Sequence, residues 1–84
     1  MNSSNIRNNS PKVLEINSDN IELYKILKLE GWSGSGGSAK LFIAEGLVSV
    51  NGEVETRKRK KIIAGDLIEF NGETISIRRK NETS

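Results

Sequence analysis

The sequence contains no cysteine and no histidine, and these two absences exclude several classes of function. Without cysteine the chain has neither a disulfide framework nor a thiolate metal site. Without histidine it also lacks a common zinc ligand and the commonest general base. Among the 11 Asp and Glu residues, no pair stands out by its spacing or by apolar surroundings. We therefore expect no enzyme, no catalytic or metal-binding residue, no cofactor and no small-molecule substrate.

Long hydrophobic runs are missing as well. The longest unbroken apolar stretch is Leu41-Phe42-Ile43-Ala44, whereas a membrane-spanning helix needs roughly 20 apolar residues. The first residues, MNSSNIRNNSP, are rich in Asn and Ser and lack the apolar segment of a secretory signal. We expect a soluble, cytoplasmic protein with no membrane partner.

The 84 residues provide for one small domain. A chain this short buries only about 60% of its unfolded surface, so its core is small and its stability modest. Residues 1–11 lack apolar content and are predicted to form a flexible tail. The helical and strand patterns fall in residues 12–77, and residues 78–84 form a polar C-terminal tail. We expect this single domain to be a monomer.

Two helices are predicted in the first half of the chain. Asp19-Asn20-Ile21-Glu22 has the form of a capping box, and apolar residues follow it at helical spacing as far as Glu30. A second helix is expected to begin after an N-cap at Ser35 and to end at Gly46, in left-handed conformation. The expected buried face of this second helix consists of Ala39, Phe42 and Ile43.

Beyond Gly46 the apolar residues alternate as in strands. Asn51-Gly52 and Asn71-Gly72 each predict a two-residue hairpin turn, because Asn-Gly supplies the two positive φ angles of a type I′ turn. Strands are expected beside both turns and at Ile62-Ile63, with a short edge strand at residues 12–16. The predicted order is helix, helix, antiparallel meander. This order indicates the α+β class, with two helices packed on a small antiparallel sheet.

The net charge of +2 is unevenly distributed along the chain. Without one run of five cations, 8 basic residues remain against 11 acidic ones, a net charge of −3. A concentrated basic segment favours a polyanionic partner, whereas diffuse basicity indicates only solubility. The alternatives are a solvated loop and a basic tract of the localisation type. The run consists of Arg57, Lys58, Arg59, Lys60 and Lys61.

A glycine-rich segment, GWSGSGG at residues 31–37, precedes the second predicted helix. Free amides at a helix N-terminus attract anions, and Lys40 one turn further on favours such a contact. The segment lacks the Gly-Lys-Ser/Thr of a P-loop, so the alternative is a flexible connection between helices. Trp32 is expected to cover the end of the core, and the alternative for it is stacking on an unpaired base.

From Ile21 to Phe70, about fifty of the 84 residues, the chain resembles the S4 RNA-binding domain. The segments at residues 27–33 and 55–59 resemble more closely its short free-standing bacterial members, the YbcJ/YaaA-like group. The residues that carry the family resemblance, at the family's spacing without a gap, are Ser35, Ala39, Phe42-Ile43, Gly46, Val48, Val50-Asn51-Gly52, Val54, Thr56-Arg57, Lys61-Ile62 and Gly65-Asp66.

The resemblance implies an αL-type fold with an RNA surface between the start of the second helix and the loop after the first hairpin. An Arg usually follows the serine of that helix, and Gly36 stands there instead, which removes a direct phosphate contact. The amides of Gly36 and Gly37, or cations of the basic run, would replace that contact. The expected RNA-binding residues are Ser35, Gly36, Gly37, Ser38, Lys40, Asn51, Arg57, Lys58, Arg59, Lys60 and Lys61.

The leading prediction is a non-catalytic protein that binds structured RNA, either ribosomal RNA or a ribosome-assembly intermediate. It would bind through the basic loop and the glycine-rich helix N-terminus. Electrostatics does not separate RNA from DNA, so the choice of RNA rests on the resemblance. One alternative is an adaptor whose basic loop docks on an acidic protein. Another is an accessory RNA-binding subunit for an RNA-modifying enzyme that acts in trans.

Overall fold

The computed structural model describes residues 12–80. The predicted N-terminal tail and residues 81–84 of the predicted C-terminal tail lie outside this range. Within it the chain forms two helices and seven strands. In chain order these are β1 (Lys12–Ile16), β2 (Ile21–Glu22), α1 (Leu23–Leu29), α2 (Gly36–Ala44), β3 (Val48–Val50), β4 (Glu53–Val54), β5 (Lys61–Ile62), β6 (Leu67–Phe70) and β7 (Glu73–Arg79).

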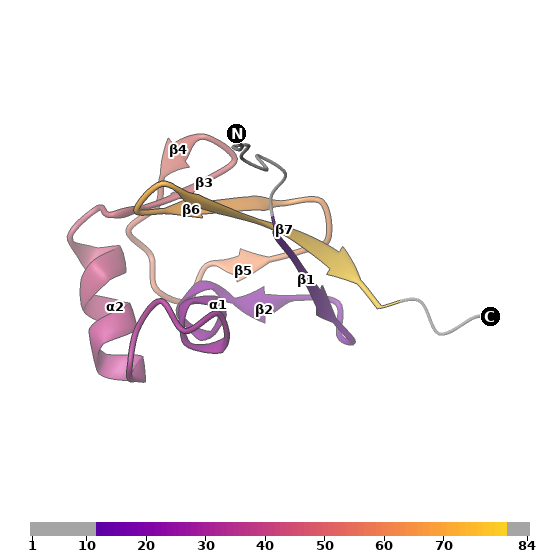
Figure 1. Ribbon diagram of the computed structural model, residues 1–84, viewed down its shortest axis with the longest axis horizontal. Helices are drawn as coiled ribbons and strands as arrows, with labels where there is room; N and C mark the ends of the chain where they lie inside the picture. The colour runs from indigo at the N-terminus through magenta and orange to yellow at the C-terminus, as the bar shows by residue number, and fades with distance from the viewer. Residues whose placement is uncertain (1–11, 81–84) are drawn as a thin grey trace, which may run out of the picture.

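The strands form a five-stranded sheet and a separate two-stranded sheet. The order in the larger sheet is β1-β7-β6-β3-β4, and the smaller one pairs β2 with β5. Both helices and the smaller sheet lie on one side of the larger sheet (Figure 1). The predicted α+β class, with two helices packed on a small sheet, is confirmed.

Two details of the predicted sheet are wrong. The larger sheet is mixed rather than antiparallel, because β1 joins its edge parallel to β7. The expected meander is also interrupted, since β5 leaves the larger sheet and pairs antiparallel with β2. The two predicted hairpins, β3 with β4 and β6 with β7, are present and antiparallel. With β5 absent from this sheet, β3 also pairs antiparallel with β6, which the meander did not predict.

The local turn and cap predictions are confirmed at four positions. Asn51 and Gly52 have φ angles of 53° and 87°, and Asn71 and Gly72 have φ angles of 54° and 82°. Gly46 follows the end of α2 with a φ angle of 80°. Ser35 is the N-cap of α2, and its side chain accepts a hydrogen bond from the backbone N–H of Ser38 at 3.1 Å. These features depend on adjacent residues, which explains why the sequence predicts them.

The predicted capping box of α1 is wrong. Residues 21–22 form β2, and Glu22 precedes the helix without a side-chain cap. The first two helical amides instead donate to the basic loop: Leu23 N to the carbonyl of Lys60 at 3.0 Å, and Tyr24 N to that of Lys58 at 3.1 Å. Asp19, the expected cap, accepts a hydrogen bond from Arg79 at 2.7 Å. Distant carbonyls satisfy the helix end, so a local cap is not needed.

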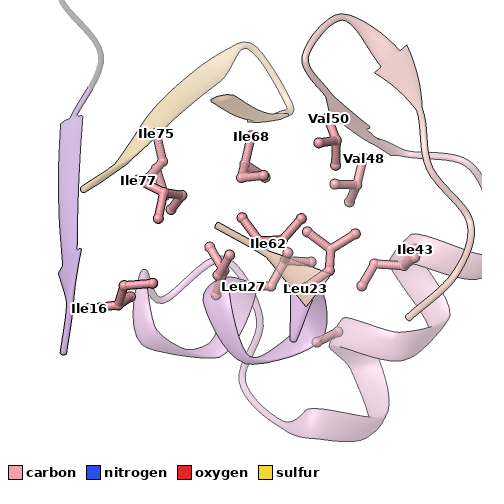
Figure 2. Close-up of a cluster of buried hydrophobic side chains, with 12 residues drawn as sticks. Ile16, Leu23, Leu27, Ile43, Val48, Val50, Ile62, Ile68, Ile75 and Ile77 are labelled. Atoms are coloured by element: carbon pink, nitrogen blue, oxygen red, sulfur yellow. The ribbon is translucent and has the colours of Figure 1, made fainter. Parts of the chain in front are cut away.

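The core lies between the larger sheet and the layer of helices (Figure 2). Isoleucines and valines of the sheet point down toward Leu23 and Leu27 of α1, Ile43 of α2 and Ile62 of β5. Ile62 is fully buried, and it lies at the centre of the cluster. No buried residue in the described range is polar or charged. The core is therefore a single apolar layer that positions both helices and the end of the basic loop.

Trp32 packs at the edge of this core, as expected for a structural residue. Its ring centroid lies 5.4 Å from that of Phe70, which in turn lies 5.4 Å from that of Phe42. The indole Nε1–H donates a hydrogen bond to Glu73 at 2.8 Å. These contacts join the glycine-rich segment to α2 and to the β6–β7 hairpin.

The predicted domain boundary at residue 77 falls inside β7, which continues to Arg79. Arg78 and Arg79 are in register with Glu15 and Ile16 of β1. The division into two tails and one domain otherwise stays a prediction. In residues 12–80 no helix has the length and apolarity needed to cross a membrane.

Candidate functional site

A groove of about 640 Å³ runs between α2 and the loop that follows β4. The helix contributes side chains at the spacing i, i+3, i+4 and i+7, which is one face of a helix. The loop contributes four consecutive residues, three of them cationic. The lining residues are Gly37, Lys40, Leu41 and Ala44 from the helix, and Thr56, Arg57, Lys58 and Arg59 from the loop.

The loop owes its position to backbone contacts with α1. The carbonyls of Lys58 and Lys60 accept the first two amides of that helix. The N–H of Lys60 donates to the carbonyl of Arg57 at 3.1 Å, which closes a tight turn. Ile62 then enters the core. The main chain of the loop is therefore anchored, while the side chains of residues 57–59 remain exposed.

The five cations of the basic run do not share one surface. Arg57, Lys58 and Arg59 line the groove beside α2. Lys60 and Lys61 line a second hollow of about 470 Å³ on the other side of the loop, which Arg57 also reaches. The loop thus divides the run between two sides, with most of its charge toward α2.

Tyr24 of α1 lies beneath three cations. The Nζ of Lys40 is 4.7 Å from the centroid of its ring, the guanidinium carbon of Arg59 is 5.9 Å away and the Nζ of Lys25 is 6.0 Å away. A cation within about 6 Å of an aromatic centroid is attracted by the ring. Arg59 also lies 3.5 Å from a carboxylate oxygen of Glu22. Tyr24 therefore holds cations from α1, α2 and the loop close to one another.

Glu55, just before the loop turns, holds Arg57 in place. Its carboxylate oxygens accept hydrogen bonds from Nε and Nη2 of Arg57 at 2.9 and 3.0 Å, and one also accepts from the Arg57 backbone N–H at 2.9 Å. These bonds, the side-chain ones above all, lower the pKa of Glu55 from its usual 4.5 to about 2. The Glu55 side chain is 13% exposed and that of Arg57 70% exposed. The pair therefore orients a guanidinium that remains open to solvent.

Replacing Glu55 by Gln removes the ion pair with Arg57 and is expected to lower the free energy of unfolding at neutral pH. The expected loss is only about 1 kcal/mol, because solvent screens the exposed arginine. The depressed pKa means that this contribution is present above about pH 4.5 and is lost as the pH falls toward about 2. Denaturant unfolding of both proteins across this pH range measures it. The control is Glu53→Gln, at an exposed position in β4. A difference between Glu55→Gln and the parent that persists undiminished at about pH 2 would contradict the pairing.

The predicted residues at the start of α2 serve partly as a cap. Ser35 accepts from the amide of Ser38, and the Ser38 hydroxyl lies 3.2 Å from both the hydroxyl and the carbonyl oxygen of Ser35. The amides of Gly36 and Gly37 have no partner within the helix, as is usual for a first turn. Of these four residues, only Gly37 lines the groove.

Asn51 is engaged in the scaffold. Its side-chain amide donates to Asp66 at 3.0 Å, and its side-chain oxygen accepts from the amide of Leu67 at 2.9 Å. Asp66 also accepts from the amide of Ile63 at 3.0 Å. These bonds tie the Asn-Gly turn to the turn before β6. A contact between Asn51 and RNA stays a prediction.

Sequence reasoning missed several residues of this surface. Tyr24 is one of them: it is partly buried against the core, and it also lies beneath the cations. Leu41 and Ala44 lie opposite the predicted core face of α2, and their helical spacing from Gly37 was the available signal. No sequence pattern indicates the role of Glu55, because its ion pair with Arg57 depends on how the loop turns. In residues 12–80 no three His, Cys, Asp or Glu side chains gather in a way that could hold a metal ion.

Residues 14–78 match the family model described as the S4 domain. The chain belongs to the S4 domain family. Among S4 domain relatives, "Putative RNA-binding protein YbcJ" of Escherichia coli (strain K12) is 56% identical over 57 residues, 68% of this chain and 81% of that protein. "Probable ribosome maturation protein RlbA" of Bacillus subtilis (strain 168) is 39% identical over 59 residues, 70% of this chain and 83% of that protein. The resemblance predicted from the sequence is confirmed.

Two solved structures resemble this chain in fold. The solution structure of E. coli YbcJ, described as containing an αL motif involved in RNA binding, has a TM-score of 0.66 and 44% identity. The match covers 92% of this chain and 99% of that one. The crystal structure of 30S ribosomal protein S4e from Thermoplasma acidophilum has a TM-score of 0.53 and 28% identity, over 68% of this chain and 30% of that one.

Proposed function

We propose that this S4 domain protein is a non-catalytic RNA-binding protein. The observation that carries the proposal is the groove between α2 and the loop, where four of the eight lining residues are cationic and none is acidic. Phosphate contacts from Lys and Arg supply a large share of the affinity of proteins for nucleic acids. The names of the E. coli and B. subtilis relatives support RNA as the polyanion.

The proposed ligand is structured RNA, bound by the basic loop and the first turn of α2. The cations Lys40, Lys58 and Arg59 would contact phosphates, with Arg57 held ready by Glu55. The free amides of Gly36 and Gly37 would contribute at the start of the helix. Ribosomal RNA or a ribosome-assembly intermediate is the proposed source, because the B. subtilis relative is named a ribosome maturation protein.

The choice of RNA is tested by comparing three polyanions of equal charge: a structured RNA, double-stranded DNA and an acidic polypeptide. Titration of each at one fixed salt concentration is expected to give the tightest binding for RNA, and replacing Arg57 and Arg59 by Gln should remove that preference. Equal binding of all three would reduce the site to a charged loop without selectivity. Tightest binding of the polypeptide would favour an adaptor for an acidic protein.

Gly36→Arg, which restores the residue usual in the resembled family, is expected to strengthen RNA binding. A Cβ at this position would meet Lys28 Cδ at 3.7 Å and Tyr24 Cε2 at 3.9 Å, both ordinary contact distances. The new cation should steepen the slope of log affinity against log salt by about 0.7 to 0.9. Gly36→Ala is the control, since it changes the helix backbone without adding charge. Equal slopes for the two variants would show that position 36 does not reach the RNA backbone.

A further inference from the structure

We infer that the floor of the groove accepts an unpaired nucleobase of the RNA, an inference that rests on the proposed RNA binding. Leu41 and Ala44 form this floor, and both are exposed to solvent. The same lining contains the cations Lys40, Arg57, Lys58 and Arg59. The groove thus combines an apolar surface with a cationic rim, which is the complement of a base attached to its phosphates.

The apolar floor is not accounted for by the fold. The core face of α2 consists of Ala39 and Ile43, which are fully buried on the opposite side of the helix. Leu41 is 53% exposed, so α2 carries a second apolar face that nothing in the described residues covers. A surface helix typically presents polar side chains on the face away from the core. An occupant with an apolar surface would explain this departure.

The positive charge of the lining and the volume of the groove both favour a nucleotide as that occupant. An apolar protein segment would leave Lys40, Lys58 and Arg59 facing no opposite charge, whereas a nucleotide supplies a phosphate beside its flat base. The volume of about 640 Å³ lies in the range of roughly 300–1,000 Å³ that small-ligand sites occupy. Lys40 and Arg59 are already held at the rim by the ring of Tyr24.

The base must be unpaired, because a paired base does not present its face. In an A-form helix both faces of each base are stacked, and the major groove is too deep and narrow for side chains to read. Specific RNA recognition therefore targets loops, bulges and ends, where bases can be splayed out. The inferred ligand is a stem with a bulged or looped-out nucleotide whose neighbouring phosphates meet the cationic rim.

Three RNA stems test the inference: a continuous duplex, the same stem with one bulged nucleotide, and that bulge without its base. The abasic bulge keeps the backbone distortion and the phosphates. The protein is expected to bind the bulged stem about 5- to 10-fold more tightly than the other two, because the base covers apolar surface of Leu41 and Ala44. Leu41→Gln should remove this preference and leave the salt dependence unchanged. The matched control is Leu47→Gln, since Leu47 is 51% exposed and does not line the groove.

The outcomes separate this inference from the proposed function. Binding of all three stems with equal affinity would overturn the nucleobase site and leave RNA binding intact. A preference for the bulged stem that survives Leu41→Gln or the loss of the base would also overturn it. No binding of any stem by a folded protein would overturn the proposed function, and the inference with it.

Discussion

Raising the salt concentration from about 50 to 200 mM is expected to weaken RNA binding by roughly 20- to 500-fold. This range follows from about three to five phosphate contacts, each contributing about 0.7 to 0.9 to the slope of log affinity against log salt. Replacing Arg57 and Arg59 together by Gln should flatten the slope by about one to two units. Glu55 already neutralises part of the charge of Arg57, so we expect a value nearer one unit. Titrations at four or more salt concentrations measure both slopes.

The matched control for this experiment is the replacement of Arg78 and Arg79 by Gln. These arginines are also exposed and paired with acidic residues, Glu15 and Asp19. They lie at the end of β7, on the opposite side of the molecule from α2 (Figure 1). The control should leave the slope unchanged. If both double variants flatten it equally, the RNA responds to total charge, and the groove is not the binding site.

Ile62→Ala is expected to lower the free energy of unfolding by about 2–5 kcal/mol, because it opens a cavity in the centre of the core. Ile62 is fully buried against both layers (Figure 2). A domain of this size has only a modest free energy of unfolding, so the variant should be largely unfolded at 37 °C. Denaturant unfolding at low temperature, followed by the fluorescence of Trp32, measures the loss.

The neighbouring isoleucine provides the control. Ile63 is 52% exposed, and Ile63→Ala is expected to change the stability by no more than about 0.5 kcal/mol. Comparable losses for the two variants would contradict the placement of β5, with Ile62 facing the core and Ile63 facing solvent. The pair also tests the anchor of the basic loop, because Ile62 follows that loop directly.

Local chemistry made part of the fold predictable from the sequence. Both Asn-Gly turns, the cap at Ser35 and the left-handed Gly46 need only two to four adjacent residues, and all are present as expected. The start of α1 was missed because its first amides bond to carbonyls more than thirty positions away in the chain. A capping-box pattern covers only neighbouring residues, so it gives no information about hydrogen bonds to distant carbonyls. β5 was assigned to the wrong sheet for a similar reason, since its pairing with β2 is non-local.

The sequence predicts which cations belong to the candidate site, but it does not predict how they are arranged. The basic run and Lys40 are visible in the sequence, and the structure brings Lys40 together with residues 57–59 in one groove. The alternation of side chains along a strand does not predict that Lys60 and Lys61 lie on the other side of the loop from α2. The place of Tyr24 beneath cations from three elements depends on how α1, α2 and the loop pack together. Tertiary packing decides these contacts.

The anchoring of the loop through carbonyls has a consequence for protein engineering. Every residue type has a backbone carbonyl, so the acceptors at positions 58 and 60 do not depend on the side chains there. The backbone path of the loop therefore does not depend on which side chains stand at positions 58 and 60. A library that randomises positions 58 and 59 while keeping Arg57, Lys60 and Ile62 would display varied side chains on a constant frame. The domain could then serve as a scaffold for selecting binders to other ligands.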